Sequence, residues 1–208
     1  GLMIAGEAAL SNWDAGMDMY IYGKLGNLTM TKEGINVLMT NLTGKVPPIL
    51  QRLDYIRFNG EAAGYLHDLT LTGLFHTGAG MVKTDVMMSI DEQSMSRTYS
   101  GSVASADLDL GKLLNQEKKF GKVDFNVELK GFNYKNRYPE SYIKGIISSF
   151  EYSQYQYENI MLDGVYKDGG FNGRLSMDDA NGSVQIDGNF NVAKTIPDFN
   201  LKASVKNL

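Results

Sequence analysis

The chain has 208 residues, of which 43% are hydrophobic and 21% charged, a balance that favours a folded core over intrinsic disorder. The formal net charge is −4 and no basic block occurs, which argues against a nucleic-acid-binding surface. The sequence has no cysteine, which excludes disulfides, thiolate catalysis and cysteine metal sites, and its two histidines, His67 and His76, form no zinc motif.

The composition favours β-structure. Glycine is frequent at 23 residues and proline is rare at 4, while tyrosine and phenylalanine contribute 12 and 9 residues. Aromatic and β-branched side chains are typical of strands. No apolar run is long enough for a helical membrane span. The chain opens with GLMIAGEAAL and stops within the strand-like pattern LKASVKNL, so we expect a segment excised from a longer protein.

Apolar and polar residues alternate with a period of two along most of the chain, which predicts strands with one apolar and one wet face. The turn signals KDGG at 167–170, DDANG at 178–182 and KTIPD at 194–198 leave only short gaps between these runs. Short gaps predict antiparallel neighbours in a meander. We therefore predict an all-β fold, a strongly curled antiparallel sheet of ten to thirteen strands with one or two short helices.

Two stretches replace this alternation with helical spacing. VPPILQRLDYI, at 46–56, has early prolines and then apolar residues three and four positions apart, and DLDLGKLLNQEKKF, at 107–120, spaces its leucines in the same way. Each stretch predicts a short helix. Asp107 or Asp109 is the expected N-cap of the second.

An internal repeat relates the two helical stretches. GKVPPILQRLDYIRFNGEAAGY (44–65) aligns without a gap with GKLLNQEKKFGKVDFNVELKGF (111–132). Repetition of one unit along a line is typical of elongated arrays. We therefore expect residues 1–208 to form a single elongated, repeat-containing segment.

Glycine occupies the apolar parity of many predicted strands, where a core would place a large side chain. A missing side chain lets a sheet bend inward, because nothing collides on the concave side. Two compatible interpretations follow: the glycines serve curvature alone, or they form the floor of a trough whose apolar lining stays open for a guest. The glycines expected on this floor are Gly73, Gly131, Gly164, Gly173 and Gly188.

Three stretches carry this pattern of strands, turns and glycines most fully: RFNGEAAGYLHDLTLTGLFHTGAGMVKTDVMMSID, ADLDLGKLLNQEKKFGKVDFNVELKGF and YENIMLDGVYKDGGFNGRLSMDDANGSVQIDGNFNVAKTIPDFNLKASVKN. They resemble AsmA-like proteins and, more closely, the TamB-like translocation and assembly proteins, over residues 55–208. The resemblance implies a large periplasmic envelope protein anchored in the inner membrane by a helix that this segment lacks. It also implies a long U-shaped, taco-like β-trough with an apolar interior.

From this resemblance we expect a non-catalytic segment whose groove carries or shields lipid acyl chains between the inner and outer membranes. The alternative is a structural or protein-binding module that assists outer-membrane protein assembly through strand-edge pairing. The expected partners are a phospholipid or another acyl lipid, an outer-membrane assembly protein, and further copies of the chain paired through sheet edges. No cofactor, metal or nucleic acid is expected. The residues expected to face the lipid are Phe125, Val127, Leu162, Phe171, Leu175, Val184, Ile186, Phe190, Phe199 and Leu201.

Other polar constellations favour structural roles. Asp107 with Asp109, and Asp178 with Asp179, are paired carboxylates, but they fall at a helix start and in a turn, where capping is the plainer interpretation. SSFEYSQYQYEN, at 148–159, interleaves tyrosines with polar residues as a carbohydrate platform would. The β-propensity of a single half-buried strand explains the same pattern.

Overall fold

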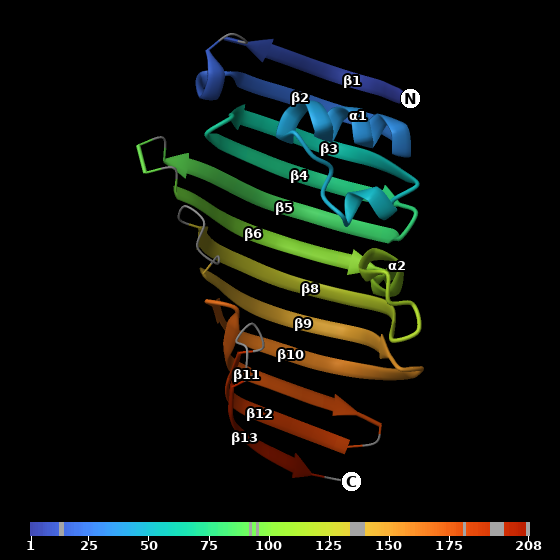
Figure 1. Ribbon diagram of the computed structural model, residues 1–208, viewed down its shortest axis with the longest axis vertical. Helices are drawn as coiled ribbons and strands as arrows, with labels where there is room; N and C mark the ends of the chain where they lie inside the picture. The colour runs from blue at the N-terminus through green and yellow to red at the C-terminus, as the bar shows by residue number, and fades with distance from the viewer. Residues whose placement is uncertain are drawn as a thin grey trace.

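The computed structural model describes residues 1–12, 15–91, 93–94, 96–133, 140–180, 182–191 and 198–206. Within them, thirteen strands form one antiparallel sheet, which confirms the predicted all-β fold (Figure 1). Strands pair in chain order from β1 to β13, except that β7 pairs with β8 beside the main path. The strands are β1 (Leu2–Ser11), β2 (Tyr20–Thr31), β3 (Tyr55–Tyr65), β4 (Asp68–Thr77), β5 (Gly80–Asp91), β6 (Ser96–Ala106), β7 (Leu108–Asp109), β8 (Phe120–Asn133), β9 (Glu140–Tyr152), β10 (Tyr155–Lys167), β11 (Gly170–Asp179), β12 (Gly182–Asn191) and β13 (Asp198–Lys206).

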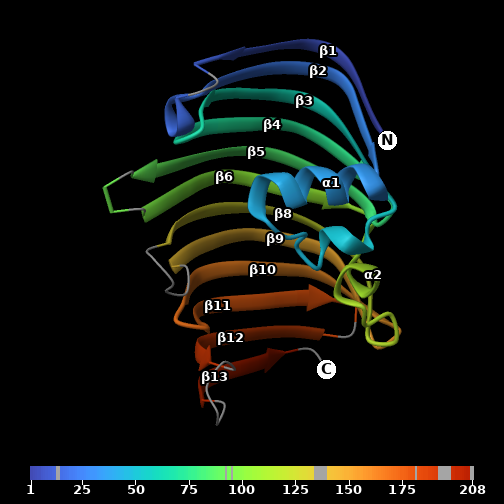
Figure 2. The same cartoon turned by 45° about the horizontal axis from the view of Figure 1, so that its top comes forward.

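The sheet is open and curled. β1 and β13 each pair on one side only and are its two edges. Figure 2 shows the strands bending toward one face, against which helices α1 (Lys32–Thr43) and α2 (Leu110–Leu114) lie. We call this the inner face and the opposite one the outer face. None of the helices in the described ranges is long and apolar enough to span a membrane.

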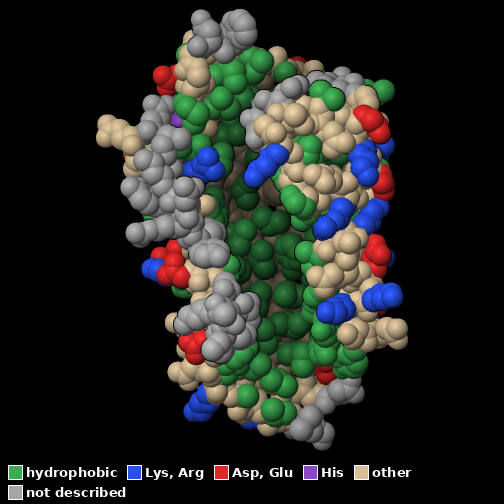
Figure 3. Space-filling view, in the orientation of Figure 1, with side chains coloured by type: hydrophobic (Ala, Val, Ile, Leu, Met, Phe, Trp, Pro, Cys, Tyr) green, Lys and Arg blue, Asp and Glu red, His purple; other side chains and the backbone are tan. Residues whose placement is uncertain are grey.

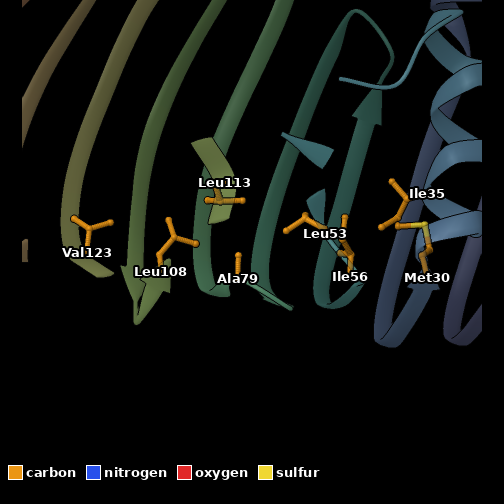
Figure 4. Close-up of a cluster of buried hydrophobic side chains, with 8 residues drawn as sticks. All are labelled: Met30, Ile35, Leu53, Ile56, Ala79, Leu108, Leu113 and Val123. Atoms are coloured by element: carbon orange, nitrogen blue, oxygen red, sulfur yellow. The ribbon is translucent and has the colours of Figure 1, made fainter. Parts of the chain in front are cut away.

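A buried cluster joins the helices to the ends of the strands. Ile35 of α1, only 1% exposed, is its most buried member. Leu53 enters it from the segment that follows a single 3-10 turn, η2 (Leu50–Arg52). The cluster therefore closes one long side of the sheet by burying apolar side chains beneath the helices. Its members are Met30, Ile35, Leu53, Ile56, Ala79, Leu108, Leu113 and Val123 (Figure 4).

Helix α1 at 32–43 was not predicted from the sequence. The Thr31 side chain accepts a hydrogen bond from the Gly34 N–H, as an N-cap does, and Gly44 ends the helix in the left-handed region with φ 73°. Ile35 and Met39, four residues apart, face the buried cluster. These signals were present in the sequence, and the strand alternation on either side concealed them.

The helix predicted at 46–56 is wrong, because only η2 forms and Tyr55 already begins β3. Pairing with β2 draws Ile56 into the ladder opposite Met30, so tertiary pairing overrides the local helical spacing. The helix predicted at 107–120 forms over five residues only. Asp109 caps it as expected, since its carboxylate accepts the Lys112 N–H at 2.8 Å.

Each of the two segments of the predicted repeat contains a strand at the same aligned position. β3 and β8 cover the aligned stretches, and the aligned residues Ile56 and Val123 both enter the buried cluster. The helices do not align, because Gly44 follows α1 whereas Gly111 lies within α2. A repeating unit along 1–208 stays a prediction.

The predicted turns fall between the expected strands. KDGG joins β10 to β11, with Asp168 and Gly169 both at positive φ, as a tight hairpin turn requires. DDANG joins β11 to β12, although Asn181 lies outside the described residues. The turn predicted at 194–198 also lies outside them, apart from Asp198.

The outer face carries a row of charged residues that runs from edge to edge and is interrupted by Thr72 of β4 and Ser102 of β6, on either side of Asp85. Glu7 of β1 is opposite Lys24 of β2, which is opposite Glu61 of β3. From β8 to β13 each strand contributes one charge of alternating sign. These residues are Glu128, Lys144, Asp163, Arg174, Asp187 and Lys202. We call the whole row the charge ladder.

The charge ladder stabilises one register of the sheet. Arg174 Nε lies 2.6 Å from Asp187 Oδ1, and Lys144 Nζ lies 3.8 Å from Asp163 Oδ2. Opposite charges directly across an antiparallel pair are favourable, whereas like charges there are unfavourable. The pairs are exposed, so we expect each to add little free energy and the row to act mainly on register.

We expect Asp187 to make the stability of the sheet pH-dependent. Hydrogen bonds from Gln185 and from Arg174 lower the pKa of the Asp187 carboxyl below its ordinary value of 3.8. The unfolded chain therefore binds the proton first as pH falls, so this stabilisation is present above about pH 4 and is lost as pH falls through the folded-state pKa. Asp187→Asn should lower Tm at neutral pH and reduce its fall on acidification, followed by circular dichroism. An acid profile identical to that of the parent chain would contradict this role.

Candidate functional site

All ten residues predicted to face a lipid lie on the inner face. Phe125 packs against the buried cluster beneath the helices, which identifies its face. The register carries that face across the sheet, since Phe125 is opposite Ile147 and Val127 is opposite Gly145. Leu162, Leu175, Val184 and Ile186 follow in these two rows, and Leu201 lies in the neighbouring inner row. Phe171, Phe190 and Phe199 stand opposite one another in a further inner row.

Three neighbouring inner rows are apolar across all six strands from β8 to β13. No polar or charged side chain stands at these register positions, all of which are described. Figure 3 shows the inner face hollowed along the long axis of the molecule, with hydrophobic side chains on the floor between two rims. We call the three rows and the hollow above them the trough. The rows are Phe125, Ile147, Ile160, Met177, Val184 and Val205; Val127, Gly145, Leu162, Leu175, Ile186 and Ala203; and Leu129, Ile143, Gly164, Gly173, Gly188 and Leu201.

The trough is open to its surroundings. Leu162, Leu175 and Ile186 are only half-buried in the middle of their strands. Toward the β13 edge the inner side chains become exposed, with Phe199 at 59% and Leu201 at 45%. A contiguous apolar surface of this kind is unusual on a soluble monomer and is typical of a ligand or partner site.

The inner face is less uniform between β2 and β6. The Ser105 hydroxyl donates to the Val123 carbonyl at 3.0 Å and accepts the Phe125 N–H at 3.1 Å, which ties β6 to β8. Thr84 Oγ1 is buried and has no hydrogen-bond partner among the described residues. These two polar residues interrupt two of the inner rows, and all three rows are apolar together only from β8 to β13. The third row, which contains Leu129, stays apolar through Gly101 and Val86 as far as Ala8 of β1.

The floor glycines also lie on the inner face. Gly164, Gly173 and Gly188 stand opposite one another across β10, β11 and β12. A Cβ on Gly173 would come within 2.5 Å of the Gly164 Cα, and a Cβ on Gly188 would collide with the Asn200 carbonyl oxygen. Glycine is needed here because neighbouring backbones approach too closely for any side chain.

At three of the glycines an aromatic ring fills the gap. A Cβ on Gly73 would lie 2.5 Å from Phe58 Cε2, one on Gly164 would lie 2.5 Å from Phe171 Cζ, and one on Gly131 would overlap the Tyr99 ring. A ring packed over a cross-strand glycine fixes strand register. The room in the trough therefore comes from the curl of the sheet and not from empty places above these glycines.

Strand β9, which supplies Ile143 and Ile147 to the trough, was not predicted from the sequence. Ile143, Gly145 and Ile147 alternate with polar or exposed residues, so the period-two signal was present. The prediction of a single strand at 148–159 is wrong. The structure has two strands joined at Ser153 and Gln154, whose φ values of 51° and 68° form a tight hairpin turn without the usual Asn-Gly signal.

The aromatic residues around this hairpin form a cluster. Ring centroids are 4.6 Å apart for Tyr155 and Tyr157 and 5.3 Å apart for Phe120 and Tyr152, and Phe150 lies between these pairs. Phe120 is also tied to the end of α2, because its N–H donates to the Gln116 carbonyl. The rings thus form an aromatic cluster at the β9–β10 hairpin, next to the segment that follows α2.

The paired carboxylates have structural partners. Asp109 caps α2, Asp178 accepts a hydrogen bond from Ser183, and Asp179 accepts one from the Tyr155 hydroxyl. His67 Nδ1 lies 3.0 Å from the Met17 carbonyl oxygen. No group of three His, Cys, Asp or Glu side chains within the described parts of the chain could hold a metal ion.

Comparison with known proteins finds no matching family model, curated protein or solved structure.

We expect the three paired glycines to be intolerant of any side chain. Gly188→Ala should destabilise the chain by about 1–3 kcal/mol, because Gly188 has φ 140° and its Cβ would meet the β13 backbone. Gly23→Ala is the matched control, since Gly23 lies in the same inner row and its Cβ would meet only Leu25 at 3.8 Å. Urea unfolding of both variants measures the difference. Equal stability of the two would contradict the close-approach explanation.

Proposed function

We propose that the trough binds lipid acyl chains and that the chain acts without catalysis, by carrying or shielding them between two membranes. In this proposal it is an internal, periplasmic part of an AsmA-like or TamB-like envelope protein. The three apolar rows are the observation that carries the proposal. The open, curled sheet also agrees with the architecture that the sequence resemblance implies.

An acyl chain needs an apolar path whose walls demand no hydrogen bonds from it. A β-sheet offers this on one face because its backbone groups bond to one another within the sheet. Twelve strands spaced about 4.8 Å apart give a row roughly 53 Å long, and β8–β13 supply about half of that length with three apolar rows side by side. The rows run across the strands, along the long axis of the molecule (Figure 3).

The energetics favour an aliphatic ligand. Each methylene moved from water into an apolar site contributes about 0.8 kcal/mol, so ten methylenes contribute about 8 kcal/mol before the costs of ordering the chain. The exposed Phe199 and Leu201 and the half-buried Leu162, Leu175 and Ile186 would leave water at the same time. A polar or charged ligand would gain nothing from this surface.

A second candidate function is protein binding through strand edges in outer-membrane protein assembly. Among the described strands, β1 and β13 each have a neighbour on one side only, and sheet edges of this kind can accept another strand. The two functions use different surfaces, since one needs the inner face and the other needs the edges. Strand binding that persists when the trough is saturated with lipid would favour the second function.

Two adjacent residues of β10 test the lipid proposal directly. Leu162→Gln places an amide on the floor of the trough, whereas Met161→Gln makes a comparable change on the outer face, where Met161 is 54% exposed. We expect Leu162→Gln to weaken binding of a fluorescent long-chain fatty acid about tenfold or more, because an unpaired amide in an apolar site costs about 1–3 kcal/mol. Met161→Gln should bind like the parent chain.

Thermal unfolding of both variants separates lost binding from lost folding. Equal binding by folded Leu162→Gln and Met161→Gln would contradict the proposal, as would an absence of binding by the parent chain.

A further inference from the structure

The outer face carries exposed apolar residues in the interior of the sheet. Ile146 of β9 stands opposite Met161 of β10, and these side chains are 49% and 54% exposed. Tyr142, 40% exposed, stands opposite Val165 on the same two strands. Both strands have a neighbour on each side, so this surface does not depend on the edges of the sheet. Apolar residues grouped among charged ones are typical of protein–protein contacts.

The charged residues beside them pair opposite signs across the same two strands. Lys144 of β9 stands opposite Asp163 of β10, with Lys144 Nζ 3.8 Å from Asp163 Oδ2. At the end of the two strands, Lys167 Nζ lies 2.7 Å from Glu140 Oε2. Along this stretch of the outer face, β9 and β10 therefore place either two apolar residues or two opposite charges across from each other.

Such a pattern is complementary to itself under one twofold rotation. An axis that runs parallel to the strands, between β9 and β10, exchanges these strands when a second copy packs against the outer face. Lys144 then meets Asp163 of the second copy, and Ile146 meets its Met161. We propose that two copies of the chain pack through their outer faces about this axis. Both troughs then point away from the contact, so the contact does not rest on the proposed function.

Other twofold axes match the two outer faces less well. An axis along the charge ladder would set each charge against the same charge of the second copy, which is unfavourable. An axis between β10 and β11 would bring Met161 against Ser176, and one between β8 and β9 would bring Ile146 against Asn126. Of these axes, the one between β9 and β10 is the one that matches charges and apolar residues together.

The flanking strands extend the match. Glu128 of β8 would face Arg174 of β11 of the second copy, and Asn126 would face its Ser176. A hollow of about 480 Å³ lies over the same four strands, β8 to β11. It gives the side chains that meet at the axis room to interdigitate, and the flexible methionine side chain of Met161 adapts to such a space.

Sedimentation velocity tests the contact in solution. We expect a monomer–dimer equilibrium without larger species, because a twofold contact is closed. Met161→Lys should weaken dimerisation about tenfold or more, since an unpaired ammonium would be buried against Ile146. Met81→Lys is the matched control, because Met81 is an exposed methionine of the outer face on β5, away from the axis. A parent chain that stays monomeric at high concentration, or equal dimerisation by the two variants, would overturn the proposal.

Mixing two variants tests which residues face each other. Ile146→Glu and Met161→Lys should each dimerise poorly alone, because every such dimer sets a lone charge against an apolar residue twice. In the mixed dimer the introduced carboxylate faces the introduced ammonium, and the remaining Ile146 faces the remaining Met161. The mixture should therefore regain the parental dimerisation to within about threefold. No recovery, when circular dichroism shows that both variants are folded, would contradict the arrangement.

A chemical cross-link locates the axis, since the chain has no cysteine of its own. Two Met161→Cys positions would lie about one strand spacing apart, on sheets packed about 10 Å from each other, within reach of a short bismaleimide. The reagent should therefore join two copies of Met161→Cys but not two copies of Met81→Cys, whose positions lie several strands from the axis. Equal cross-linking of both variants, or none of Met161→Cys, would refute the proposed axis. These outcomes are independent of whether the trough binds lipid.

Discussion

The period of two in an extended chain is the constraint on which this structure depends. Successive side chains point to opposite faces, so a slip of one residue between strands would turn an apolar row into water and a charged row onto the floor. Leu162 precedes Asp163, and Ile186 precedes Asp187, so the same slip would disrupt the trough and the charge ladder together. The two faces therefore specify one register between them.

The curl of the sheet depends on close approaches that few residues allow. Gly164, Gly173 and Gly188 bring three backbones together where any side chain would collide. Phe58, Tyr99 and Phe171 lie over glycines and hold the neighbouring strands in place. The buried cluster under α1 and α2 holds one end of the strands from β2 to β8, and no other α-helix of the described residues lies on the inner face. The apolar surface is therefore open because of the way the sheet curls, and not because side chains are absent above the glycines.

Much of the sheet was predictable from the sequence, because each strand signals its own faces locally. The strand alternation, the hairpin turn at 168–169 and the N-cap at Asp109 were all recognisable from a few neighbouring residues. The inner-face position of the ten residues expected to face a lipid followed from parity alone, since parity decides the face once the strands exist. The glycines on the apolar parity also indicated the face toward which the sheet bends, whereas the packing of α1 against that face was not local information.

The errors arose where local and tertiary signals disagree. At 46–56 the helical spacing predicted a helix, but pairing between β3 and β2 overrides it and places Ile56 opposite Met30. The hairpin at Ser153 and Gln154 lacks the usual turn residues. Tyr99 fills the gap at Gly131 from a neighbouring strand that is some thirty residues away in sequence. Single-sequence patterns do not contain such long-range contacts.

The central claim is that the trough is an open apolar site that holds acyl chains. Mass spectrometry of lipids extracted from the purified chain, beside a soluble control protein from the same cells, tests it most directly. We predict enrichment of phospholipid or fatty acid in the chain over the control. Equal, background levels in both samples would contradict the account, because the apolar rows would then be closed to lipid.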